Sequence, residues 1–249
     1  MLADRSKGAV AYREEFYSGY AAATGKDTLT RDYFETCARQ YEGRWGKHLP
    51  RVPHARFLDL ACGNGEFLYF LERRGFTNVE GIDLCAASID NARSMGIMTA
   101  RHGDLFEQPL PPCRYDVITA FNIVEHLTKD EVLVFVRRIH EALTPGGAAW
   151  IVTPNGLSPF GSATRYWDFS HESSFTPAAW RQLARLTGFR AEFEEWGPIR
   201  HSMPGCVRWV LWKGICLLID AWSLIEVGGP RDVARVYTAD MKVILVKER

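Results

Sequence analysis

One stretch of the chain decides the fold: Arg56-Phe57-Leu58-Asp59-Leu60-Ala61-Cys62-Gly63-Asn64-Gly65-Glu66-Phe67-Leu68. The apolar run over 57–61 has the length of a buried strand rather than a helix. The chain then turns through two glycines, and apolar side chains follow with helical spacing from Phe67 onwards. A strand, a glycine turn and a helix in this order predict the first unit of an α/β fold.

The two glycines of this turn, Gly63 and Gly65, indicate a ligand that lies against the backbone, where a Cβ atom would collide with it. The next strand, at 79–83, ends in Asp83, at a spacing that suits a carboxylate bound to both ribose hydroxyls of a nucleoside. Leu68 replaces the third glycine of the dinucleotide fingerprint, and acids including Asp59 flank the turn. Carboxylates disfavour a pyrophosphate but tolerate a sulfonium with an ammonium group, so the pattern favours S-adenosylmethionine over NAD.

Five segments resemble, in this order, the motifs of class I S-adenosylmethionine-dependent methyltransferases. They are Asp59-Leu-Ala61-Cys-Gly63-Asn-Gly65, Gly81-Ile-Asp83-Leu84, Gly103-Asp104-Leu105, the run from Tyr115 to Leu127, and Leu143-Thr-Pro145-Gly146-Gly147. The resemblance covers residues 55–155, and Ala61 stands where many members carry another glycine. It implies S-adenosylmethionine as the cofactor and S-adenosylhomocysteine as the product. The cofactor-binding residues that it implies are Asp59, Ala61, Gly63, Gly65, Asp83, Leu84, Asp104, Leu105, Asn122 and His126.

The alternation of strands and helices over 56–155 predicts a parallel sheet that is covered on both faces. With the resemblance, we expect a Rossmann-like three-layer sandwich with a mostly parallel, seven-stranded sheet. We expect a single domain over 1–249, with a helical cap at 1–55, the cofactor-binding core at 56–155, and an acceptor-side loop, insertion and final strands at 156–249. Ligands of such sheets lie at the carboxyl ends of the strands. Asn122 and Asn155 fall near that edge, together with the acids and glycines already named.

Composition narrows the class of protein. The chain has 249 residues, of which 47% are apolar and 24% charged, and its thirty acids balance its thirty bases. This balance creates no overall attraction to nucleic acid, so no nucleic-acid partner is expected. The six cysteines are scattered without metal-ligand spacing, which predicts reduced thiols and no metal site. The first residues lack the features of a signal peptide, so we expect a cytoplasmic protein.

The loop from Arg165 to Thr176 contains our candidate general base, His171, with Asp168 and Glu172 close by in sequence. An imidazole has a reference pKa near 6.5, and a neighbouring carboxylate can orient it and raise its basicity. Such a group can remove the proton of a hydroxyl as a methyl group arrives. The alternative role of His171 is to hold the loop in place. His126 is the rival base, although we interpret it chiefly as part of the cofactor pocket.

The pattern Asp168-Phe-Ser-His171, followed by Phe175-Thr176, resembles a segment of bacterial methyltransferases of surface-polysaccharide synthesis. This implies O-methylation of a sugar hydroxyl in a bacterial surface glycan or its precursor. A quinone-like or other small-molecule acceptor is the runner-up. A NAD-dependent dehydrogenase and a non-catalytic cofactor-binding module are less favoured.

The aromatic insertion over 198–236 is interpreted as an acceptor pocket or a surface for a partner. Membrane contact through 206–225 is the weaker interpretation, because charged residues interrupt the apolar run. The oligomeric state stays open.

Overall fold

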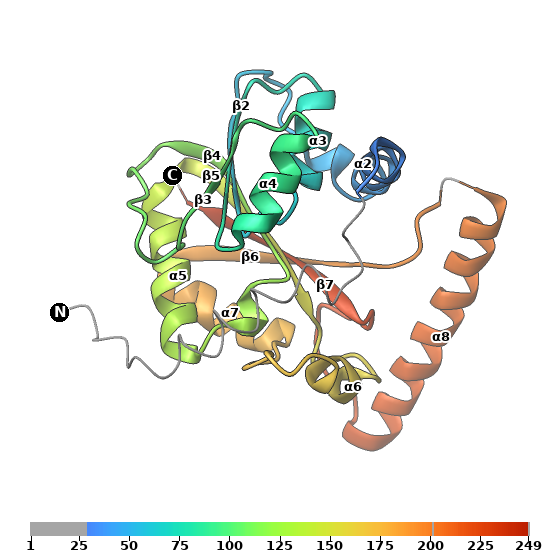
Figure 1. Cartoon of the computed structure of the whole chain (residues 1–249). Helices are drawn as coiled ribbons and strands as arrows, with labels where there is room; N and C mark the ends of the chain where they lie inside the picture. Colours follow the sequence, from blue (N-terminus) through green and yellow to red (C-terminus); the bar gives the residue numbers. More distant parts are fainter. Residues whose placement is uncertain (1–28, 201, 249) are drawn as a thin grey trace.

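The computed structural model describes residues 29–200 and 202–248, and its centre is one seven-stranded sheet (Figure 1). The strand order is β3-β2-β1-β4-β5-β7-β6, and β7 runs antiparallel to both of its neighbours while the others pair in parallel. The predicted mostly parallel sheet is therefore confirmed. The strands are β1 Arg56–Leu60, β2 Asn78–Asp83, β3 Ala100–His102, β4 Tyr115–Phe121, β5 Leu143–Pro154, β6 Phe189–Glu195 and β7 Asp240–Lys247.

Helices cover both faces of this sheet (Figure 1). Helices α2, α3 and α4 pack on one face, and α5 and α7 pack on the other. The predicted helical cap at 1–55 contains α2 in its described part, whereas residues 1–28 of the cap lie outside the described residues. The helices are α2 Arg31–Trp45, α3 Glu66–Arg73, α4 Ala86–Ser94, α5 Lys129–Ala142, α6 Gly161–Tyr166, α7 Pro177–Thr187 and α8 Met203–Val227, with short 3-10 turns η1 Gly46–His48 and η2 Val124–His126.

The central strands contribute to two hydrophobic cores, one on each face of the sheet, because successive side chains of a strand point to opposite faces. Phe57 of β1 joins the core beneath α2, α3 and α4, whereas the next residue, Leu58, joins the core beneath α5 and α7. The same alternation occurs in β5, where Trp150 and Ile151 lie in different cores. The central strands are thus buried on both sides, which leaves their carboxyl ends as the place for a ligand.

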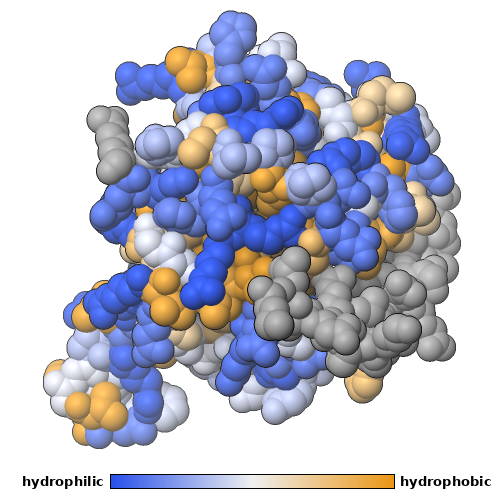
Figure 2. All heavy atoms as spheres, turned by 90° about the vertical axis from the view of Figure 1, so that its left-hand side faces the viewer, coloured by the Kyte–Doolittle hydropathy of each residue, from blue (hydrophilic) through white to orange (hydrophobic). Residues whose placement is uncertain are grey.

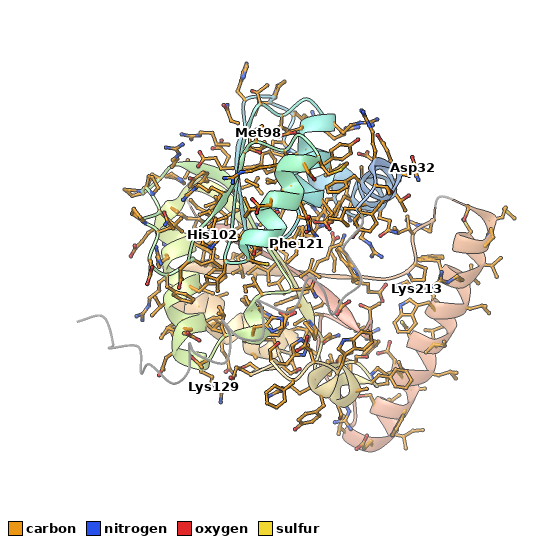
Figure 3. The ribbon with its side chains drawn as sticks, viewed as in Figure 1. Asp32, Met98, His102, Phe121, Lys129 and Lys213 are labelled. Carbon is orange, nitrogen blue, oxygen red and sulfur yellow. The ribbon has the colours of Figure 1, made fainter. Side chains whose placement is uncertain are left out.

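Trp45, the last residue of α2, fixes that helix to the sheet. Its ring stacks on Trp150, with centroids 5.0 Å apart and planes within 3°, and on Phe121 at 5.4 Å. Phe121 is labelled near the middle of the fold in Figure 3. The Trp45 side chain is fully buried. Stacked aromatic pairs add about 0.5–1.5 kcal/mol each beyond the burial of their area, so this stack holds the end of α2 over β4 and β5.

The insertion over 198–236 contains α8, a helix of 25 residues that stands beside the body of the protein (Figure 1). Within the described residues, α8 joins neither of the two core clusters. Throughout residues 29–200 and 202–248, no helix is long and apolar enough to cross a membrane.

Replacing Trp45 with alanine should lower the free energy of unfolding by about 3–5 kcal/mol, because it removes a buried indole and leaves a cavity between Trp150 and Phe121. Urea denaturation measures the change. Trp167→Ala is the matched control, because Trp167 is 85% exposed; it should change stability by less than about 0.5 kcal/mol. Equal losses in the two variants would contradict this role of Trp45.

Candidate active site

The turn between β1 and α3 leaves room for a ligand at the carboxyl edge of the sheet. Ala61, Gly63 and Gly65 all have positive φ angles, of 60°, 56° and 81°, a region that glycine enters at little cost. A Cβ atom added to Gly63 would meet, among the described residues, one atom within 4 Å, a Glu66 carboxylate oxygen at 3.7 Å. The backbone at Gly63 is therefore open, as expected where a ligand lies against it.

The structure gives Gly65 a different reason to be glycine. A Cβ atom at this position would approach Ile97 Cδ1 to 3.0 Å and Ala92 Cβ to 3.4 Å. Gly65 therefore faces α4 and the loop that follows it, and a side chain there would first collide with protein. The residue is needed for its left-handed backbone and for this close packing.

Asp83, at the tip of β2, connects the turn to the neighbouring strand. One carboxylate oxygen accepts a hydrogen bond from Gly63 N at 2.7 Å, and the other accepts from Cys85 N at 2.8 Å. Burial raises the pKa of Asp83, and the charge of Glu66 raises it further, while the two backbone donors act in the opposite direction. The predicted ribose-binding acid is thus held rigidly beside the glycine turn.

Three carboxyl groups surround this turn and repel one another. Burial raises the pKa of Asp59 to about 7, and the charges of Asp83 and Glu66 add to the shift, although Thr119 donates a hydrogen bond of 2.6 Å to Asp59. Tyr33 of α2 donates to Glu66 at 3.1 Å. A cation bound here would relieve the repulsion. These acids therefore fit the sulfonium and ammonium groups of S-adenosylmethionine.

The remaining predicted cofactor residues come to the same edge. Asp104 and Leu105 follow β3, Leu84 follows β2, and Asn122 follows β4 with a left-handed φ of 53°. Leu105 is buried in the core on the α5 side. Asn155, also expected at this edge, is fully buried, and its side-chain amide donates to two backbone carbonyls of the segment before β7, at 2.9 and 3.0 Å. Its role is therefore structural.

The two histidines that we predicted as rival bases are neighbours. The rings of His126, in η2, and His171 lie 4.8 Å apart between centroids. His171 Nδ1 lies 3.1 Å from the Thr164 carbonyl oxygen. Because a carbonyl can only accept, Nδ1 carries the hydrogen and neutral His171 keeps its lone pair on Nε2. This is the tautomer that a general base requires.

Asp168 acts on His126 rather than directly on His171. Its Oδ1 accepts from the Ser170 hydroxyl at 2.6 Å and from Ser170 N at 2.8 Å. The Ser170 oxygen then accepts from His126 Nδ1 at 2.8 Å, so neutral His126 also keeps its lone pair on Nε2. Burial would raise the pKa of Asp168, but the Ser170 bonds and the two histidines lower it overall.

The other carboxylate that we predicted beside His171 belongs to Glu172. Glu172 is exposed, and its backbone N–H donates to the Glu125 carbonyl at 2.8 Å. Arg165 donates to the backbone carbonyls of both His171 and Glu172. The loop is thus held in place through its backbone.

Glu125 completes a group of three side chains that could hold a metal ion. It is almost fully buried, Thr153 donates to it at 3.2 Å, and burial raises its pKa to about 8. The ligand atoms of Glu125, His126 and His171 all lie within 4.8 Å of one another. Two imidazoles and a carboxylate are suitable ligands for a divalent cation. The scattered cysteines had led us to expect no metal site. This group was not visible in the sequence, because its residues come from two segments that only the fold brings together.

A cavity of about 590 Å³ lies at the end of β6, between α2 and α8. Its lining includes six basic side chains, Arg44, Lys47, Arg200, Lys213, Arg235 and Lys242, against two acidic ones, Glu194 and Glu195.

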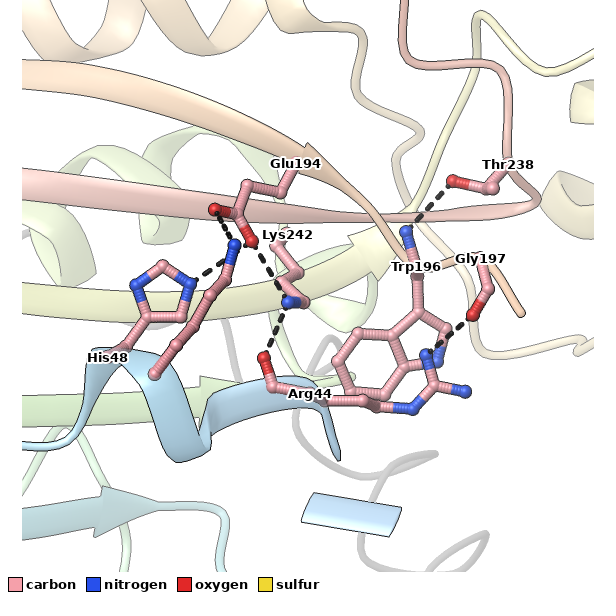
Figure 4. A network of polar contacts seen from close by, with 8 residues as sticks. Arg44, His48, Glu194, Trp196, Gly197, Thr238 and Lys242 are labelled. Atoms are coloured by element: carbon pink, nitrogen blue, oxygen red, sulfur yellow. Dashed lines mark hydrogen bonds and ion pairs between the residues drawn. The ribbon is translucent and has the colours of Figure 1, made fainter. Parts of the chain in front are cut away.

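Figure 4 shows part of the polar network of this cavity. Lys242 contacts Glu194 at 3.0 Å, and Arg44 lies over the Trp196 ring, with 3.9 Å to its centroid. The charges of both Arg44 and His171 act on the carboxyl group of Asp240, lowering a pKa that burial raises. The carboxyl group of Asp240 therefore lies within the electrostatic reach of both the cavity and the histidine pair.

Comparison with known proteins indicates the same class of protein as the geometry of the glycine turn and its acids. Residues 30–192 match a family model described as a methyltransferase domain. The chain belongs to this family, the class I S-adenosylmethionine-dependent methyltransferases, and its cofactor is S-adenosylmethionine.

Its relatives carry related names. A protein of Mycolicibacterium smegmatis described as a probable S-adenosylmethionine-dependent methyltransferase is 32% identical over 160 residues, which are 62% of this chain and 59% of the relative. A ubiquinone biosynthesis O-methyltransferase of Bradyrhizobium is 31% identical over 49% of this chain and 48% of its own length. The chain thus spans about half to three-fifths of these relatives.

Two solved structures show the same fold. A methyltransferase from Archaeoglobus fulgidus superposes with a TM-score of 0.62 at 20% identity, over 84% of this chain and 94% of that one. Phosphoethanolamine N-methyltransferase 2 of Haemonchus contortus, in complex with S-adenosylmethionine, gives 0.60 at 17% identity, over 99% of this chain and 59% of that one.

Asp83→Ala should weaken S-adenosylmethionine binding by about 1.5–3 kcal/mol for each charge-assisted hydrogen bond that is lost. Isothermal titration calorimetry measures the affinity, and circular dichroism verifies that the variant is folded. Asp116→Ala is the control, because Asp116 lies at the amino end of β4 and accepts from Arg56 N at 2.9 Å, on the far edge of the sheet. An unchanged affinity in a folded Asp83 variant would refute its assignment.

Cofactor affinity should fall as the pH is lowered through about 7, the pKa of Asp59. Protonation removes the negative charge that attracts the cationic cofactor, so a loss of at least about fivefold is expected between pH 7.5 and 5.5. In Asp59→Asn the affinity should be lower at pH 7.5 and should vary less with pH. If the variant keeps the full pH dependence, another group is responsible.

Proposed function

We propose that this protein transfers a methyl group to a hydroxyl oxygen of a sugar in a bacterial surface glycan or its precursor. The observation that carries the proposal is the pair of histidines at the carboxyl edge, next to the acid-lined turn, with Asp168 ordering His126 through Ser170. When bound, S-adenosylmethionine supplies an electrophilic methyl group and leaves as S-adenosylhomocysteine. The acceptor oxygen forms the new carbon–oxygen bond, and His171 Nε2 takes its proton.

Position would contribute more than the base. Holding the hydroxyl close to the methyl group and in line with it can lower the barrier by about 7–11 kcal/mol. A general base typically adds a factor of about 10²–10⁴. Hydrogen bonds of Nδ1 fix the tautomers of both His126 and His171. We choose His171 as the base because it belongs to the loop that we assign to the acceptor side.

The surroundings of His171 support a sugar that carries an anionic group. Four large aromatic side chains near this loop are exposed, and aromatic faces can pack against the apolar face of a sugar: Phe160, Tyr166, Trp167 and Phe169. Beyond Asp240, the cavity has more basic than acidic side chains, which suits a phosphate group. This combination favours an activated precursor, such as a nucleotide sugar, over a neutral glycan.

The purified protein should release S-adenosylhomocysteine with a nucleotide sugar, whose mass increases by one methyl group in place of a hydrogen. The same assay with neutral oligosaccharides and with phenolic quinone precursors provides the comparison. Turnover of the phenols alone would favour the runner-up acceptor, which three relatives also suggest by name. Cofactor binding without turnover across broad panels of acceptors would indicate a binding module.

His171→Ala should lower kcat by about 10²–10⁴-fold while S-adenosylmethionine affinity stays near that of the wild type. His171→Gln keeps a side-chain N–H donor for the loop but cannot act as a base, so it should be as inactive as the alanine variant. His126→Gln is the matched comparison. A His171→Gln variant with nearly normal kcat would exclude His171 as the base.

A chelator distinguishes a base from a metal ligand. If His171 acts as a base, EDTA should leave the activity of the wild type unchanged. Loss of activity in EDTA and its recovery with a divalent cation would instead assign Glu125, His126 and His171 to a metal ion.

A further inference from the structure

Helix α8 turns two of its four charged side chains, Lys213 and Asp220, toward the body of the protein. Lys213 contacts Glu195 at 2.6 Å and Trp212 Nε1 donates to the same carboxylate at 3.3 Å, while Asp220 accepts from Tyr237 at 2.6 Å. Figure 3 labels Lys213 on the side of α8 that faces the body. The helix is therefore attached to its own chain largely through polar contacts.

The outer face of α8 is apolar and exposed. Leu218 is 72% exposed and Ile225 is 86% exposed. Arg208 and Glu226 are the charged residues among the exposed positions of this helix. Among the coloured residues on the opposite side of the molecule, which Figure 2 turns to the viewer, hydrophilic side chains predominate. A long apolar face beside a hydrophilic body indicates a surface that another molecule covers.

The outer face has a seven-residue repeat. Its middle line follows spacings of four and three residues, and all six positions are exposed: Val207, Leu211, Gly214, Leu218, Ala221 and Ile225. Seven-residue spacing keeps one line of side chains facing a partner helix along its whole length. A lipid surface requires an apolar face but no such repeat.

Gly214 gives a second, independent indication of a partner helix. Glycine in the middle of a helix lowers its stability relative to alanine. An added Cβ atom at Gly214 would meet nothing within 4 Å among the described residues, so the packing of this chain does not require glycine. A closely packed partner would require it, because small residues let two helix backbones approach.

We propose that α8 pairs with α8 of a second copy of this chain in antiparallel orientation. Antiparallel alignment places a small or medium side chain opposite a large one in every layer, namely Gly214 with Leu218 and Ala221 with Leu211. Parallel alignment would instead stack glycine on glycine and leucine on leucine. Arg208 and Glu226 lie on the same flank, near opposite ends of α8, so antiparallel pairing also brings opposite charges together.

A membrane surface is the less favoured partner of this face. Helices that lie on membranes carry many lysines and arginines on their polar face. In α8 the two basic residues are Arg208 and Lys213, and Lys213 pairs with Glu195 of its own chain. The two acids, Asp220 and Glu226, cancel their charge.

Sedimentation equilibrium of the full chain should show a dimer. Leu218→Glu should raise the dissociation constant of the dimer at least about tenfold, because it places a charge in the middle of the interface between the two α8 helices. Leu186→Glu is the matched control, since Leu186 of α7 is also exposed, at 62%, but lies on another helix. A monomeric wild type, or an equal effect of both variants, would overturn the proposal.

A size exchange tests the pairing itself. Ala221→Leu and Leu211→Ala should each weaken the dimer, and the double variant should recover it, since large and small residues face each other again. On phosphatidylglycerol vesicles, a lipid-binding helix would instead gain affinity from Ala221→Leu and lose it from Leu211→Ala. That response in a monomeric protein would assign the face to lipid and overturn the dimer.

Co-expressed Val207→Cys and Ile225→Cys chains test the orientation. Under mild oxidation, the two variant chains should form a disulfide with each other. The yield of this linked pair should exceed that of either variant linked to itself and that of the linked wild-type dimer. Preferential linkage of identical chains would indicate parallel pairing and contradict the antiparallel arrangement.

Discussion

The hydrogen bond from Gly63 N to the Asp83 carboxylate, 2.7 Å long, is the constraint on which the cofactor half depends. It brings the tip of β2 against the β1 turn, and Gly81 makes this approach feasible. A Cβ atom at Gly81 would lie 2.6 Å from Leu68 Cδ1 and 2.9 Å from Cys62 Sγ. One carboxylate therefore both orders the turn and adds to the negative field around Asp59 that suits a cationic ligand.

The cofactor-binding half of the fold could be predicted from sequence because its determinants are local. A strand, a turn with positive φ and an acid at the next strand end are all encoded within a short stretch. The boundaries were less accurate where strands continue through glycine. The motif from Leu143 to Gly147, for example, lies inside β5, which begins at Leu143 and reaches regular pairing with β4 after a register shift.

The catalytic contacts could not be predicted in the same way, because they depend on how a loop folds back. Asp168 lies close to His171 in sequence, which suggested a direct pair. The Asp168 carboxylate instead accepts from the backbone N–H and the hydroxyl of Ser170, in a local turn. His126, 44 positions before Ser170, then receives the interaction that the sequence pattern had suggested for His171.

We propose that acceptor choice and cofactor binding are encoded in different parts of the chain. The family model ends at residue 192, whereas most of the residues that line the cationic cavity follow it, from Phe193 to Lys242. Similarity over the shared core therefore reports the cofactor and the fold. Specificity would come from the ends of β6 and α2 and from the inner face of α8. Lys213 and Trp209 of α8 line the cavity. Pairing of the outer face of α8 would therefore stabilise the proposed acceptor site without contacting that site.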